Sequence, residues 1–155
     1  MIGRILAAFG ALALVFVLAL SSPAGAQERE PLTIVTADGQ RHAFSIDLAD
    51  TAQERQLGLM NVESIADDYG MLFDFGQTAP VSMWMKNTLL SLDMLFVGED
   101  GTVKSIARRT KPLSTRTIPS GAPVKAVLEI RGGRASELGV KVGDRIEHPL
   151  FAAKP

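Results

Sequence analysis

Residues 82–97 read Ser-Met-Trp-Met-Lys-Asn-Thr-Leu-Leu-Ser-Leu-Asp-Met-Leu-Phe-Val, an apolar run that is interrupted by Lys86, Asn87 and Asp93. The run also contains Trp84, the one tryptophan of the chain. A charged side chain inside an apolar segment is tolerated where it is paired, hydrogen-bonded or open to a cavity. The segment therefore predicts either an internal polar strut that fixes a turn or a ligand pocket.

The spacing within the run allows Lys86 either role. On an extended strand Ser82, Trp84 and Lys86 share one face, so the ammonium group of Lys86 would lie beside the indole ring in a cation–π contact. In the strut hypothesis, Asp93 reaches back across a hairpin and pairs with Lys86. In the pocket hypothesis, Lys86 binds a carboxylate or phosphate, Trp84 stacks on a ring and Asn87 orients the ligand.

Short apolar runs lie on both sides of this segment and are separated by turn residues. Asp38-Gly39 and the Gly98–Gly101 segment are typical of hairpin turns, while residues 108–123 predict a loop. The pattern predicts a mostly β fold, a compact antiparallel small barrel or sandwich of seven to eight short strands with two short helices. The predicted strands are residues 32–36, 41–48, 71–75, 81–86, 92–97, 102–107, 125–130 and 145–148.

Both predicted helices are short. Thr51 and Glu54 have the spacing of a capping box, in which each side chain satisfies a free backbone N–H of the first helical turn. A helix therefore begins after Thr51, and Leu57 and Met60 are expected to face the core. Residues 135–138 predict one further helical turn.

The first 26 residues have the pattern of a secretory signal peptide. Arg4 precedes an apolar stretch of sixteen residues, 5–20, which is shorter than the roughly 20 residues of a membrane-spanning helix. Ala24-Gly25-Ala26 then provides a small-x-small cleavage site. An uncleaved N-terminal anchor is the alternative. With cleavage, residues 27–155 form a single domain that is periplasmic or secreted, with no membrane insertion afterwards.

The composition excludes several classes of function. The chain has no cysteine, which excludes a lipoprotein anchor, disulfides and thiolate chemistry. Removal of residues 1–26 leaves a net charge of −2, which provides no strong field for nucleic acid or an anionic bilayer. Two histidines without cysteine make no zinc signature, and phosphate-binding, dinucleotide-binding and serine-nucleophile motifs are absent from the sequence. No catalytic residue, metal site or cofactor is predicted.

Several motifs resemble those of the DUF192 family, also called UPF0127, in order and spacing. The resemblance covers about residues 52–147, and it implies a small β-rich fold with short helices, often behind an export signal, but no established activity. This chain has Ser91 where the family usually has proline, and Asn61-Val62 where it often has an aromatic residue and an arginine. The motifs are Arg55-Gln-Leu-Gly58-Leu59-Met60, Gly70-Met71-Leu72-Phe73, Trp84-Met85-Lys86-Asn87-Thr88, Leu92-Asp93, Val127-Leu128-Glu129 and Gly143-Asp144.

Arg55 and Glu129 are charged residues inside these motifs and are further candidates for the site. By strand alternation, Glu129 should point away from Leu128. A Glu129 ion pair with Arg55 or with Lys86 would give it a purely structural role. If Glu129 and Asp93 instead faced one cleft, they could divide the roles of acid and base.

The sequence therefore favours a non-enzymatic binding module of the cell envelope, whose partner is an unknown small molecule or envelope protein and not nucleic acid. A hydrolase that uses the paired carboxylates of Asp93 and Glu129 is one alternative. A purely structural or protein-interaction role is another. The candidate ligand-binding residues are Trp84, Lys86, Asn87, Asp93, Arg55 and Glu129.

Overall fold

The computed structural model describes residues 29–152, so the predicted signal peptide lies outside the described residues. Within these residues, seven strands are accompanied by two short α-helices, α1 (Ala52–Leu57) and α2 (Arg134–Glu137), and by one 3₁₀ turn, η1 (Pro149–Phe151). The predicted mostly β fold is confirmed. The strands are β1 (Glu30–Val35), β2 (Arg41–Ala49), β3 (Tyr69–Met83), β4 (Leu92–Val97), β5 (Val103–Ala107), β6 (Ile118–Arg131) and β7 (Arg145–Glu147).

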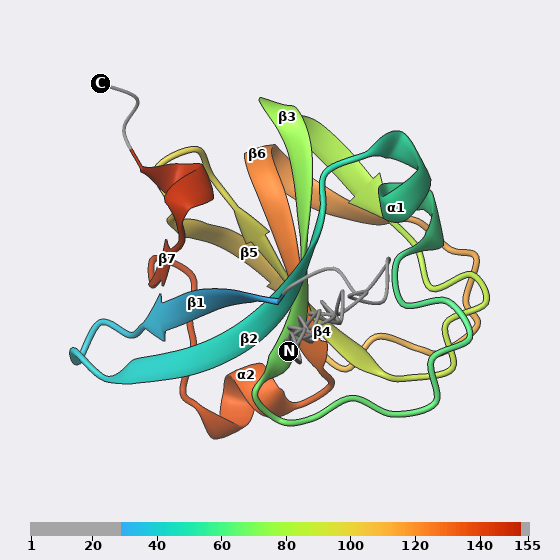
Figure 1. Ribbon diagram of the computed structural model, residues 1–155, viewed down its shortest axis with the longest axis horizontal. Coiled ribbons are helices and arrows are strands. Elements are labelled where there is room, and N and C mark those ends of the chain that lie inside the picture. The colour runs from blue at the N-terminus through green and yellow to red at the C-terminus, as the bar shows by residue number, and fades with distance from the viewer. Residues whose placement is uncertain (1–28, 153–155) are drawn as a thin grey trace, which may run out of the picture.

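The strands form one sheet in the order β5-β4-β6-β3-β2-β1-β7, which curls into a half-barrel (Figure 1). Each neighbouring pair is antiparallel except β2 and β3, which are parallel because α1 and its flanking loops connect them. The two edges approach each other at one place, where Thr102 pairs with Arg145 in an isolated bridge. The β1–β2 hairpin and α1 lie on opposite sides of the molecule (Figure 1).

Strands β3 and β6 are longer than the sequence predicts. Residues 71–75 and part of 81–86, expected as separate strands, belong to one strand that continues past Gly76 and Pro80. The β3–β6 register shifts between Asp74 and Ala79 and again near Pro80, so bulges accommodate these residues. Residues 118–123, expected in a loop, belong to β6 because they pair with this extension of β3.

The sheet buries a hydrophobic core on each face. Leu72, Leu95 and Leu128 are adjacent across three strands and belong to the core inside the curl. Residues adjacent to these in each strand, including Phe73 and Val127, point the other way and belong to a second core on the outer face. Because strand side chains alternate between faces, burial on both sides explains why all six residues of β4 are buried.

Helix α1 lies near the end of β3, over the outer face of the sheet (Figure 1). The predicted capping box is present, because Thr51 Oγ1 accepts from the Glu54 N–H and the Glu54 carboxylate accepts from the Thr51 N–H. The expectation that Leu57 faces the core is wrong, since 58% of Leu57 is exposed. The chain turns at Gly58 after a single short helix, and Leu59 enters the core instead. Within residues 29–152, no helix is long and apolar enough to cross a membrane.

Candidate functional site

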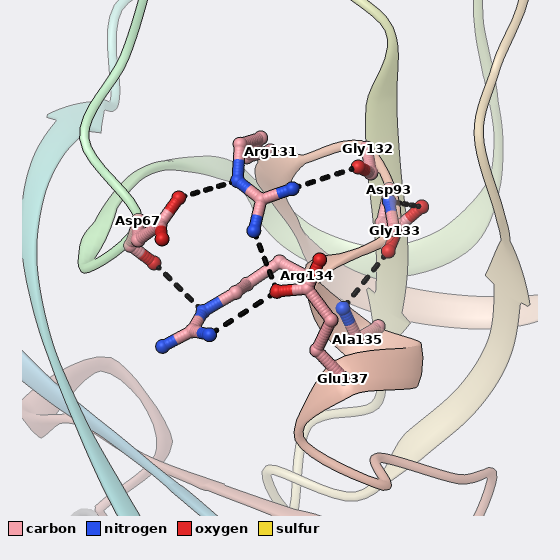
Figure 2. Close-up of polar contacts among 8 residues, drawn as sticks. All are labelled: Asp67, Asp93, Arg131, Gly132, Gly133, Arg134, Ala135 and Glu137. Carbon is pink, nitrogen blue, oxygen red and sulfur yellow. Dashed lines mark hydrogen bonds and ion pairs between the residues drawn. The ribbon is translucent and has the colours of Figure 1, made fainter.

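Asp93 is completely buried and hydrogen-bonded to the backbone (Figure 2). Its Oδ1 accepts from the N–H of Gly133 at 3.0 Å and of Arg109 at 2.7 Å, and its Oδ2 accepts from the N–H of Ala135 at 2.9 Å. These amides belong to the start of α2 and to the segment after β5. Asp93 therefore joins three parts of the chain, which is the role of a polar strut.

Ion pairs surround the same corner on its exposed side (Figure 2). Arg131 contacts both Asp67 and Glu137 at 2.5 Å, while Arg134 bonds to Glu137 at 3.2 Å and donates to the backbone oxygen of Asp67. The two arginines lower the pKa of Glu137 by hydrogen bonding to its carboxylate. These exposed contacts add little stability individually, and they fix the connection between β6 and α2.

Lys86 lies in the turn after β3, where its Nζ is 5.1 Å from the centre of the Trp84 ring. The predicted cation–π contact is therefore confirmed. The predicted ion pair with Asp93 is wrong, because Lys86 is exposed whereas Asp93 is buried and accepts from backbone amides. Among residues 29–152, Lys86 makes no ion pair with a carboxylate.

Asn87 shapes the turn that presents Trp84 and Lys86. Its φ of 54° lies in the left-handed region, which asparagine tolerates better than most residues. Its backbone oxygen accepts from the N–H of Asn61 at 2.9 Å, and its amide nitrogen lies 3.9 Å from the sulfur of Met60. Asn87 therefore attaches this turn to the segment that follows α1.

Arg55 connects α1 to the sheet. Its Nη1 donates to the backbone oxygen of Asp50 at 2.5 Å and to that of Asp74 at 2.7 Å, and its guanidinium lies 5.9 Å from the centre of the Phe75 ring. The predicted ion pair between Arg55 and Glu129 is not formed. The Nη1 of Arg55 donates to two backbone carbonyls instead.

A pocket of about 130 Å³ lies between α1, the end of β3 and the turn after it. Glu129, from the middle of the sheet, is its most deeply buried ionisable residue. The pocket thus brings together four of the six predicted site residues, namely Arg55, Trp84, Lys86 and Glu129. The remaining lining residues are Gln56, Leu57, Gly58, Leu59, Met60, Phe73, Phe75, Ser82, Met83 and Thr88.

Glu129 is 4% exposed, and its carboxyl group has no hydrogen-bond or ion-pair partner among residues 29–152. Burial raises the pKa of Glu129 to about 8, so this group is mainly protonated at neutral pH. In that state it can donate one hydrogen bond and accept others. The predicted alternation is correct, because Glu129 lies on the face opposite that of Leu128.

The paired-carboxylate cleft is not formed. In the β4–β6 register Asp93 is opposite Ile130 and Met94 is opposite Glu129, so the two carboxyl groups point to opposite faces of the sheet. The hydrolase hypothesis therefore loses the geometry on which it depends. The apolar walls of the pocket were not predicted, because Phe73 and Phe75 join Glu129 only through the register of β3 and β6.

The comparisons with known proteins give relatives of this fold without an established activity. The family model DUF192, described as "Uncharacterized ACR", matches residues 33–148. A crystal structure from Sinorhizobium meliloti 1021, described as a "putative transcription regulator", is 46% identical with a TM-score of 0.77, and the match covers 79% of this chain and 95% of that one. A protein of unknown function from Novosphingobium aromaticivorans DSM 12444 is 38% identical with a TM-score of 0.76, covering 82% and 90% respectively. No curated protein matches the chain.

Proposed function

Since the chain belongs to the DUF192 family, which is described only as uncharacterised, we propose from the pocket itself that the protein is an exported module that binds a small molecule between α1 and the sheet. The observation that carries this proposal is the carboxyl group of Glu129, a buried residue that lines the pocket and has no hydrogen-bond or ion-pair partner in the described part of the chain. A ligand that enters the pocket can hydrogen-bond to this carboxyl group in surroundings from which most water is excluded, where such a bond is stronger than in bulk water.

Comparison with Asp93 supports a binding role for Glu129. Both residues are buried in adjacent strands, but Asp93 meets three backbone amides and Glu129 meets none. A carboxyl group that served only the fold would have partners like those of Asp93. Glu129 instead lines a pocket, where an incoming molecule can reach it.

The rim of the pocket also suits a ligand. Trp84 is 43% exposed and Leu57 is 58% exposed, so two large apolar side chains face solvent beside the opening. Lys86 extends next to Trp84 without a carboxylate partner in the described part of the chain. Exposed aromatic and cationic groups around an apolar cavity are typical of small-molecule sites.

An envelope location is part of the proposal, because residues 1–26 have the pattern of a cleaved signal peptide. Fractionation of cells that produce the full chain should place the protein in the periplasm or the medium. Its N-terminus, measured by mass spectrometry, should begin at Gln27. A full-length protein in the cytoplasm would contradict this part of the proposal.

A fluorescence screen tests the binding role, because the one tryptophan lies at the rim of the pocket. The purified protein is titrated with a collection of metabolites while Trp84 emission and the melting temperature are followed. A true ligand changes the emission of the wild type and raises its melting temperature. It should do neither with Glu129→Met, which keeps the side-chain length but removes the carboxyl group.

The matched control is Glu63→Gln, which changes an exposed glutamate outside the pocket. This variant should bind every ligand as the wild type does. If the compounds that bind the wild type bind Glu129→Met equally well, the proposed site is wrong. If no compound in a broad collection binds, the proposed function is wrong.

A further inference from the structure

The pocket has polar groups at two ends and apolar walls between them. At the buried end, Glu129 offers a carboxyl group without a partner among residues 29–152. At the exposed end, Lys86 carries its ammonium group beside the Trp84 ring. The same pocket is also lined by Phe73 and Phe75, together with other apolar side chains of the outer face. A ligand that satisfies both ends must therefore have two polar groups separated by an apolar body.

The volume of the pocket limits the size of that body. About 130 Å³ is close to the volume of an engineered cavity, about 150 Å³, that binds benzene. The volume of the pocket therefore matches a ligand body of a single six-membered ring. A second ring or a long chain would have to extend beyond Trp84 into solvent.

The charges in the pocket determine the polarity of the ligand. Arg55 and Lys86 are its two cationic lining residues, and Glu129 is its one acidic lining residue. Because burial keeps Glu129 mainly neutral near pH 7, the lining is net positive. Lys86 lies at the exposed end and makes no ion pair among residues 29–152, whereas the Nη1 of Arg55 is held by the backbone oxygens of Asp50 and Asp74, so we assign Lys86 to the ligand.

Building on the proposed function, we propose that the pocket binds a small aromatic monocarboxylate that carries a hydroxyl group opposite its carboxylate. The ring packs against the aromatic side chains that line the pocket, Phe75 and Trp84 among them. The hydroxyl group points inward and exchanges hydrogen bonds with Glu129. The carboxylate points outward and pairs with Lys86.

An aromatic amine fits the same cavity less well. Its ammonium group would have to pass Lys86 and Arg55 to reach the buried end. It would also require Glu129 to lose a proton in an apolar site, which burial opposes. Left at the rim, the ammonium group would lie beside Lys86 and be repelled by it.

The test is calorimetric titration with para-hydroxybenzoate and three analogues. Benzoate lacks the hydroxyl group, para-hydroxybenzyl alcohol lacks the charge, and tyramine has an ammonium group instead of the carboxylate. We expect para-hydroxybenzoate to bind tightest, with benzoate about tenfold weaker because a buried hydrogen bond is lost. The uncharged alcohol should bind about fivefold weaker, since an exposed ion pair contributes modestly.

Two variants test which pocket residue contacts each polar group of the ligand. Lys86→Ala should lower the affinity for para-hydroxybenzoate about fivefold and leave the affinity for para-hydroxybenzyl alcohol unchanged. Glu129→Met should lower the affinity for para-hydroxybenzoate to that for benzoate, and it should leave the affinity for benzoate unchanged. Lys141→Ala, which removes an exposed lysine outside this pocket, should change nothing.

The outcomes separate the ligand class from the proposed function. Tighter binding of tyramine than of para-hydroxybenzoate would overturn the proposed ligand class, but the proposed function as a small-molecule binder would stand. Absence of para-hydroxybenzoate binding while other compounds bind in the fluorescence screen would do the same. Failure of both experiments would overturn the ligand class and the proposed function together. Binding of para-hydroxybenzoate that neither variant changes would place it outside the pocket and overturn the inference.

Discussion

Two buried carboxyl groups on adjacent strands serve different purposes in this protein. Asp93 faces the interior of the curled sheet, where it meets the N–H groups of Gly133 and Ala135 at the start of α2. Glu129 faces the opposite side of the sheet and lines a pocket. The same side-chain chemistry is therefore satisfied by the backbone at one position and faces a pocket at the other.

Replacing Asp93 should destabilise the protein severely, whereas replacing Lys86 should not. Asp93→Ala leaves three backbone N–H groups without an acceptor and should lower the free energy of unfolding by about 3–5 kcal/mol. Lys86→Ala removes an exposed cation–π contact and should cost less than about 1 kcal/mol. Urea unfolding of both single variants and the double variant measures these values.

The double variant tests whether Asp93 and Lys86 are energetically coupled. Because Asp93 and Lys86 do not pair, their effects should add within about 0.5 kcal/mol. Strong non-additivity would show that the two residues are coupled after all, as the strut hypothesis for Lys86 required.

Glu129 should make the stability of the protein decrease as the pH rises. Burial raises its pKa from 4.5 to about 8, so the folded protein retains a proton that the unfolded chain releases between these values. Each pH unit in this window lowers the free energy of unfolding by about 1.4 kcal/mol. The wild type should therefore lose about 4 kcal/mol between pH 5 and pH 8 from this residue alone. Glu129→Gln has no proton to lose, so it should lack this component.

The difference between wild type and Glu129→Gln isolates this residue from other titrating groups. Urea unfolding at pH 5, 6.5 and 8 should show that the variant gains stability relative to the wild type as the pH rises. The control Glu63→Gln should follow the wild type at every pH. A constant difference between wild type and Glu129→Gln would mean that Glu129 is already ionised in the folded protein.

The sequence predicts contacts between neighbouring residues better than contacts between distant ones. Trp84 and Lys86 are two residues apart, and their predicted contact is formed although both lie beyond the end of β3. The amides that bind Asp93 come from residues 109, 133 and 135, whose proximity depends on the complete fold. The residue type of Asp93 therefore indicated a buried polar contact, but its partner could not be deduced.

At the scale of elements, α1 depends on attachments at its ends because it buries no residue of its own. The capping box stabilises its first turn, and Arg55 joins its last turn to β3 through the backbone oxygen of Asp74. The helix also supplies one wall of the pocket. Its anchoring therefore affects the shape of the site.

Arg55→Gln should loosen α1 without unfolding the sheet. The shorter amide cannot hold the backbone oxygens of Asp50 and Asp74 together, so the α1 amides should exchange with deuterium about tenfold faster. Hydrogen exchange followed by mass spectrometry measures this change against β4 as an internal reference. Arg116→Gln, an exposed arginine outside α1, is the control and should leave α1 exchange unchanged. Equal exchange of α1 in both variants would show that Arg55 does not anchor the helix.

The elements that local sequence defines were predicted well. The capping box at Thr51 and the turn at Gly39 each depend on a few adjacent residues, and both occur as expected. The full lengths of β3 and β6 were not predicted, because glycine and proline usually end a strand. Here each strand continues because the other pairs with it across two shifts of register.

At the scale of the whole molecule, the curled sheet is closed near β7, whereas α1 lies on the other side of the molecule (Figure 1). Residues of α1 line the pocket. Closure depends on a close approach between Gly101, at the turn before β5, and Ile146 in β7. The N–H of Ile146 donates to the backbone oxygen of Gly101 at 2.7 Å. This bond and the one from the N–H of Val103 to the backbone oxygen of Asp144, at 2.8 Å, form the Thr102–Arg145 bridge, which joins the two edges of the sheet.

Gly101→Ala should open this junction because no side chain fits there. A Cβ atom at Gly101 would lie 2.6 Å from the backbone oxygen of Ile146, and the φ of Gly101 is +78°. Gly39→Ala is a matched control, since Gly39 has a φ of +83° but nothing within 4 Å of an added Cβ. Both variants lose about 1–2 kcal/mol to backbone strain.

Only Gly101→Ala also forces the two edges apart, so it should be less stable than Gly39→Ala by at least about 1 kcal/mol in urea unfolding. Its Ile146 amide should also exchange faster, because the hydrogen bond to Gly101 is lost. Ligand affinity should be unchanged in the folded fraction of both variants, since neither glycine lines the pocket. Equal stability of the two variants would mean that the edges can separate at no cost, and that the half-barrel is held by its core rather than by this junction.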